Sequence, residues 1–119
     1  MTQTSEKKQF VLRTGGTGGG NYQLPVPESE GYIIGRSDAQ SVYPPDIDLA
    51  SFQARDRGVS RRHAALVTYS GELHILDLDS VNGTFVNNKR LLPESPFALR
   101  HGDRIMLGDF ELIFVQEQS

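Results

Sequence analysis

The stretch that decides the fold is HAALVTYSGELHILD, which spans residues 63–77. Side chains in its first half fall into two alternating sets, and a period of two residues is that of a β-strand. The pair Ser70-Gly71 then marks a tight turn, and Leu73 and Ile75 belong to a second strand. The stretch therefore predicts a β-hairpin.

Short apolar segments lie on both sides of this hairpin, separated by residues typical of turns. Glycine, asparagine and aspartate gather between the segments, and no stretch sustains a helical period. Many short strands at even spacing are typical of an all-β sandwich or barrel, which is the predicted fold class. The further strands that we expect span residues 10–12, 22–26, 31–36, 84–86, 97–99, 104–107 and 110–116.

Length and composition indicate one soluble domain. We expect a flexible tail over residues 1–9, a β-domain over residues 10–116 and a short tail over residues 117–119. The chain has no cysteine, which excludes disulfides and thiolate chemistry and suits a reducing compartment. No apolar run approaches a membrane span or the core of a signal peptide. We expect a cytoplasmic domain, or a cytoplasm-facing one within a larger membrane protein, without direct membrane insertion.

A basic cluster precedes the hairpin. Four of the twelve Lys and Arg residues fall within residues 55–62, although the net charge of the chain is −3. The net charge argues against nucleic acid as a partner, whereas basic residues beside the Ser60 hydroxyl suit a single phosphoryl group. A solvated charged loop is the alternative interpretation of the cluster.

Further groups that suit a phosphate occur in other loops. Arg36 follows a glycine at one strand end, Ser60 and Arg61 precede another strand, and Asn82 lies in a turn after a third. Guanidinium and hydroxyl groups form charge-assisted hydrogen bonds to phosphoryl oxygens, and an asparagine amide can hold a peptide backbone. Because loops at one end of a β-sandwich can meet, the pattern predicts a phosphate-binding site, with an exposed Arg36 side chain.

A glycine-rich segment over residues 14–21 does not match nucleotide-binding loops. No lysine follows the glycines as a P-loop requires, and the last glycine of G-x-G-x-x-G is replaced by Asn21 or Gln23. Pro25 and Pro27 prevent a helix from following directly, so no helix N-terminus is available for a phosphate. We interpret the segment as a flexible hairpin connection, and we expect no cofactor.

We expect neither catalytic nor metal-binding residues. Ser60 and His63 are three residues apart, which places their side chains on opposite faces of an extended segment, and no G-x-S-x-G motif surrounds the serine. A hydrolase using this pair is the weaker alternative to a structural histidine. The histidines share no metal-ligand spacing, and a calcium loop beginning at Asp77 would have Asn82 and Asn88 at the positions of its glycine and glutamate.

Three motifs together resemble the signature of forkhead-associated (FHA) domains. They are Gly35-Arg36, SRRH at residues 60–63 and DLDSVNGTFVN at residues 77–87. LRHGDRI at residues 99–105 is similar to the penultimate hairpin of that family. The resemblance covers about residues 10–115, nearly the whole chain.

This resemblance implies an eleven-stranded, antiparallel-rich β-sandwich with binding loops at one end. It also implies recognition of phosphothreonine in partner proteins or peptides, without catalysis and without a metal. The alternative is a phosphate-independent scaffold or oligomerisation domain that uses the same sandwich. We expect a monomer, either complete or part of a longer protein.

By the resemblance, Arg36 and Ser60 would bind the phosphate, and Arg61 would contact the phosphate or the peptide backbone. Asn82 would hold the backbone next to the phosphothreonine. Many family members carry threonine where this chain has Val81, which lacks the hydroxyl group. Candidate additional contacts are Ser80, Val81 and Asn87, and the structural residues are Gly35, His63 and Gly83.

Overall fold

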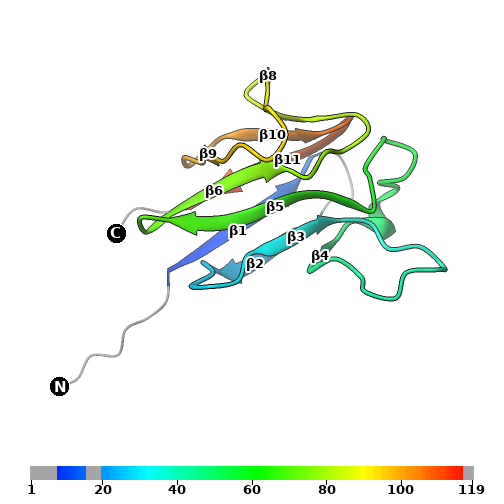
Figure 1. The fold of residues 1–119 in the computed structure, drawn as a ribbon, viewed down its shortest axis with the longest axis horizontal. Helices are drawn as coiled ribbons and strands as arrows, with labels where there is room; N and C mark the ends of the chain where they lie inside the picture. The colour runs from blue at the N-terminus through cyan, green and yellow to red at the C-terminus, as the bar shows by residue number, and fades with distance from the viewer. Residues whose placement is uncertain (1–7, 16–19, 117–119) are drawn as a thin grey trace.

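The computed structural model describes residues 8–15 and 20–116, and in these residues eleven strands form two sheets (Figure 1). The six-stranded sheet has the order β2 (Asn21–Pro25), β1 (Gln9–Thr14), β11 (Phe110–Val115), β10 (Arg104–Leu107), β7 (Thr84–Val86), β8 (Lys89–Arg90). The five-stranded sheet has the order β4 (Ile47–Asp48), β3 (Tyr32–Gly35), β5 (Arg62–Tyr69), β6 (Glu72–Asp77), β9 (Phe97–Ala98). The predicted antiparallel-rich β-sandwich is confirmed, and within the described strands only β3 and β4 pair in parallel.

The hairpin predicted from residues 63–77 is formed by β5 and β6. Ala65 pairs with Leu76 and Tyr69 pairs with Glu72, so the two strands are in register up to the turn. Ser70 and Gly71 have φ values of 53° and 78°. Two consecutive positive φ values are those of a type I′ turn, whose twist matches that of the strands it connects.

The core lies between the sheets and is made by alternate residues of their strands. The Phe10 and Phe114 rings, from β1 and β11, have their centroids 5.9 Å apart. Burying such side chains supplies most of the favourable free energy of folding. The fully buried apolar side chains include Leu12, Ile34, Leu66, Ile75, Ile105, Leu107 and Leu112.

The expected tails and the glycine-rich segment fall partly outside the described residues. Residues 1–7, 16–19 and 117–119 are not described, whereas Gln9 already belongs to β1. The interpretation of the glycine-rich segment as a hairpin connection agrees with the antiparallel pairing of β1 and β2. In the part of the chain that the structure describes, no helix has the length and apolar character needed to cross a membrane.

The register of the five-stranded sheet gathers the predicted binding loops at one end. Gly35, at the end of β3, pairs with Arg62 at the start of β5. Ala64 pairs with Asp77, the last residue of β6. The β3–β4 loop (residues 36–46), the β4–β5 loop (residues 49–61) and the β6–β7 turn (residues 78–83) therefore lie together, at the right in Figure 1. A 3₁₀ helix, η1 (Ala50–Phe52), lies within the β4–β5 loop.

Candidate functional site

Arg36 is fixed against the β4–β5 loop. Its backbone N–H donates to the carbonyl of Arg61 at 3.2 Å, and its Nε donates to the carbonyl of Val59 at 2.6 Å. Only 19% of its side chain is exposed, so the prediction of an exposed side chain is wrong. The sequence could not show that the guanidinium would be bonded to the carbonyl of Val59, 23 residues away in the chain. A Cβ at Gly35 would lie 1.9 Å from the Arg61 carbonyl oxygen, so this close approach requires glycine.

His63 connects the β4–β5 loop to the β6–β7 turn. Its Nδ1 accepts a hydrogen bond from the backbone N–H of Ser60 at 3.0 Å, so the hydrogen of the neutral ring is on Nε2. Nε2 then donates to the carbonyl of Gly83 at 2.9 Å. Burial lowers the pKa of His63, although the bond to Gly83 and the nearby Asp77 act in the opposite direction.

Asp77 organises the β6–β7 turn from the end of β6. Its carboxylate accepts hydrogen bonds from the backbone N–H and hydroxyl of Ser80 and from the hydroxyl of Thr84. Burial raises its pKa, but these hydrogen bonds outweigh burial and hold the pKa below its ordinary value. The Ser80 hydroxyl also accepts from the N–H of Gly83 at 2.9 Å, so it is engaged on both sides.

The β6–β7 turn is bonded to the β4–β5 loop at two further points. The Ser60 hydroxyl oxygen accepts from the N–H of Val81 at 3.2 Å, which leaves the hydroxyl hydrogen for a ligand. The amide nitrogen of Asn82 donates to the carbonyl of Gly58 at 3.0 Å. The Val81 side chain is 82% exposed beside this junction. The structure thus brings Ser60, Val81 and Asn82 together.

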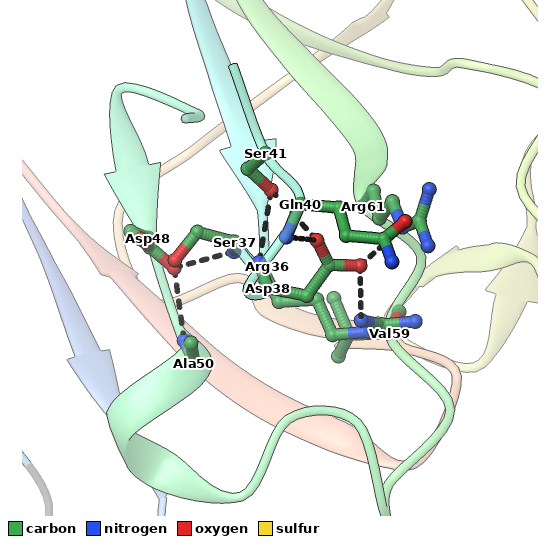
Figure 2. A network of polar contacts seen from close by, with 9 residues as sticks. All are labelled: Arg36, Ser37, Asp38, Gln40, Ser41, Asp48, Ala50, Val59 and Arg61. Carbon is green, nitrogen blue, oxygen red and sulfur yellow. Dashed lines mark hydrogen bonds and ion pairs between the residues drawn. The ribbon is translucent and has the colours of Figure 1, made fainter. Parts of the chain in front are cut away.

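Asp38 is a central residue of the site that the sequence analysis missed. Figure 2 shows its carboxylate between the side chains of Arg36 and Arg61. Oδ2 lies 2.6 Å from Nε of Arg61 and 4.0 Å from a terminal nitrogen of Arg36. The hydrogen bond from the backbone N–H of Gln40 is the main cause that lowers the pKa of Asp38, and the two arginines add to it. An aspartate soon after an arginine was the only sequence signal, and aspartate is common in loops.

Asn87 lies elsewhere, in the turn between β7 and β8. Its amide donates to Asp103 at 2.9 Å and accepts from the N–H of Arg104 at 3.0 Å. The structure therefore does not bring Asn87 into contact with the other predicted site residues. Gly83, in contrast, ends the β6–β7 turn with a φ of 89°, a value that favours glycine.

The gathered groups can hold an oxyanion. Two guanidinium groups already converge on one carboxylate oxygen, and the Ser60 hydroxyl belongs to the loop that binds Arg36. Guanidinium donors suit planar or tetrahedral oxyanions, and phosphate gains most from them because of its charge. The described residues contain no cluster of three or more His, Cys, Asp or Glu that could bind a metal ion.

The FHA-domain family model matches residues 32–108 of this chain. Protein FraH of Nostoc sp. is 44% identical over 70 residues, which are 59% of this chain and 24% of that protein. The oxoglutarate dehydrogenase inhibitor of Corynebacterium efficiens is 30% identical over 106 residues, which are 89% of this chain and 63% of that protein. The chain thus spans less than two thirds of the length of either relative.

A solved FHA domain has a similar structure. It comes from a structural and functional analysis of phosphothreonine-dependent FHA domain interactions, and it is 32% identical to this chain. The two structures agree with a TM-score of 0.69, over 93% of this chain and 99% of that chain.

Proposed function

The chain belongs to the FHA-domain family, and from this membership we propose that it binds phosphothreonine in segments of partner proteins. The observation that carries the proposal is the convergence of Arg36 and Arg61 on one oxygen of Asp38. Arg61 lies 2.6 Å from this oxygen and Arg36 lies 4.0 Å from it, so the two guanidinium groups supply the charge and the donors that a phosphoryl oxygen requires. The solved FHA domain from work on phosphothreonine-dependent interactions supports the same ligand class.

The predicted contact residues divide between the phosphate and the peptide backbone. Arg36 and Ser60 bind the phosphate, and Arg61, with 64% of its side chain exposed, reaches the phosphate or the peptide backbone. Asn82 holds the backbone next to the phosphothreonine. It uses the amide oxygen and the second amide hydrogen of its side chain, which are not bonded to Gly58. Val81 offers methyl groups to the ligand in place of a hydroxyl group.

Other residues act by positioning these groups. We assign Gly35, His63 and Gly83 to holding the loops in place, because each lies where two segments meet. We assign Ser80 the same positioning role, because its only hydroxyl hydrogen is already donated to Asp77.

The proposed module is non-catalytic and cytoplasmic. A Ser–His hydrolase needs an imidazole nitrogen that can take the hydroxyl proton of Ser60. Here Nδ1 of His63 accepts from the backbone N–H of Ser60, and Nε2 is bonded to the carbonyl of Gly83. Neither nitrogen is placed for that proton transfer.

Calorimetric titration with a phosphothreonine peptide library tests the proposal. Each peptide is also used in its unphosphorylated form, and we expect measurable binding only where the phosphate is present. Equal binding of phosphorylated and unphosphorylated peptides would contradict the proposal and favour the phosphate-independent scaffold.

Replacing Arg61 tests the site itself. Arg61→Gln removes charge-assisted hydrogen bonds worth about 1.5–3 kcal/mol each, so the affinity for a phosphothreonine peptide falls about tenfold to a hundredfold. Arg62→Gln is the matched control, because it removes the same charge from the adjacent exposed residue. Equal losses in the two variants would indicate a general charge attraction instead of a phosphate contact.

A further inference from the structure

We propose that Asp38 is a built-in competitor for the phosphate site and determines how much negative charge a ligand must carry; this inference rests on the proposed function. Its Oδ2 occupies the space between the guanidinium groups of Arg36 and Arg61 (Figure 2). These are the groups that a phosphoryl oxygen would contact. The chain thus supplies its own anion where the ligand's anion would bind.

The position of the Asp38 carboxylate is fixed by its own loop. Oδ1 accepts a hydrogen bond from the backbone N–H of Gln40 at 2.9 Å and one from the hydroxyl of Ser41 at 3.2 Å. The same Ser41 hydroxyl accepts from the N–H of Asp38 at 2.9 Å, and the N–H of Ser41 donates to the Asp38 carbonyl at 3.1 Å. The two carboxylate oxygens therefore have separate functions: Oδ1 closes the turn and Oδ2 faces the arginines.

A tethered carboxylate is an effective competitor because it loses no translational freedom when it binds. A glutamate or aspartate side chain of a partner brings about one negative charge, the same as Asp38, so the exchange gives it no gain. A phosphoryl group brings about −1.5 to −2 charges and three acceptor oxygens. It can therefore displace Oδ2 from Arg61, or bind beside it, where a carboxylate cannot. Asp38 would thus exclude acidic sequences that lack a phosphate.

The substitution Asp38→Asn isolates this effect. The asparagine carbonyl can replace Oδ1 in the turn, while its NH₂ group replaces Oδ2 and cannot accept from Arg61. We expect the variant to bind a phosphothreonine peptide at least about fivefold more tightly than the unaltered chain. We also expect it to gain measurable affinity for the same peptide with glutamate at the phosphothreonine position, so that selectivity for phosphate over carboxylate falls.

Two further variants make the experiment decisive. Asp56→Asn removes one negative charge from the exposed part of the adjacent β4–β5 loop, and it should change neither the affinity nor the selectivity. If Asp38→Asn is poorly folded, Asp38→Ser takes its place in the experiment. Serine retains a small hydrogen-bonding side chain in the turn, and we expect the same gain in affinity and the same loss of selectivity. Thermal unfolding of each variant checks the fold.

The outcomes separate this inference from the proposed function. If the unaltered chain prefers the phosphorylated peptide but both Asp38 variants bind it equally or more weakly, Asp38 positions the arginines and the inference is overturned. If only the Asp38 variants bind it, the competition is supported in its strongest form. If none of the proteins distinguishes phosphorylated from unphosphorylated peptide, the proposed function and the inference both fail.

Discussion

At the residue scale, His63 is the buried ionisable group that joins two of the binding loops. It accepts one hydrogen bond from Ser60 and donates one to Gly83, which requires the neutral ring. Protonation of Nδ1 would break the hydrogen bond from Ser60 and place a charge in the core that the nearby Asp77 offsets only in part. The integrity of the binding loops is therefore tied to the protonation state of one imidazole.

We expect stability to fall as His63 becomes protonated. Burial lowers the folded-state pKa of His63 below 6.5, whereas the unfolded chain titrates near that value. Between the two values the unfolded state binds more protons, so the stabilising contribution is complete above about pH 6.5 and decreases as the pH falls below it. Urea unfolding at about pH 7.5 and about pH 5.5 should show this loss.

The carboxylates with lowered pKa values affect stability only at lower pH. The pKa values of Asp38, Asp48 and Asp77 lie below 3.8, so their contributions are lost at more acidic pH than that of His63. His63→Gln should remove the decrease in stability between about pH 7.5 and about pH 5.5, because glutamine does not titrate. The variant should also lose the stability that the neutral imidazole provides. An NMR titration midpoint of the His63 ring at or above 6.5 in the folded chain would refute the prediction.

At the element scale, the β6–β7 turn depends on the carboxylate at the end of β6. The Asp77 carboxylate accepts hydrogen bonds from the hydroxyls of Ser80 and Thr84. The Ser80 hydroxyl in turn accepts a hydrogen bond from the N–H of Gly83. Asn82 lies between these fixed points, so the orientation of its amide depends on them. A short turn without regular structure is thereby held by side-chain hydrogen bonds.

Ser80→Ala should weaken both the fold and the site. The variant loses the bond to Asp77 at 2.6 Å and the bond to Gly83 at 2.9 Å, which should reduce the free energy of unfolding by about 1.5–3 kcal/mol. Because the turn carries Asn82, phosphopeptide affinity should also decrease, and urea unfolding with calorimetric titration measures both. Ser95→Ala, at an exposed position, is the control. Normal stability of Ser80→Ala would show that the turn does not need this hydroxyl.

The strands differ in how well the sequence predicted them. Burial alternates along β6, β10 and β11, whereas β5 buries four consecutive residues; all four strands were expected. β8 consists only of Lys89 and Arg90, both exposed, and exists because it pairs with β7. Two charged residues have no periodicity, so only the tertiary pairing identifies this strand.

At the scale of the whole molecule, the fold was predictable but the geometry of the site was not. Alternation and turn chemistry act over a few residues, and they led to an all-β prediction without knowledge of strand order. The Arg36 contact with Val59 and the Asp38 contact with Arg61 arise only when the β3–β4 and β4–β5 loops meet. No local sequence pattern contains these contacts between loops, and for this reason the partly buried Arg36 was expected to be exposed and Asp38 was not considered.

The site also connects the two sheets. Arg36, Ser60 and Arg61 flank strands of the five-stranded sheet, whereas Asn82 precedes β7 of the six-stranded sheet. Backbone bonds strengthen this connection, because the N–H of Asp109 donates to the Arg57 carbonyl at 2.8 Å. A ligand that bonds all of these loops would therefore resist separation of the sheets.

We expect a phosphothreonine peptide to stabilise the entire domain and not only the loops. At a free concentration of about 100 times Kd, a ligand that binds only the folded state adds about 2.7 kcal/mol, which should raise Tm by about 10 °C for a domain of this size. Hydrogen exchange should slow in β3 and β5 of one sheet and in β7 and β10 of the other, because opening either sheet breaks the site. The unphosphorylated peptide should give no shift, and Asn82→Ala should give a smaller shift at the same peptide concentration. Slower exchange confined to the β3–β4 loop and the β6–β7 turn would show that the ligand does not couple the two sheets.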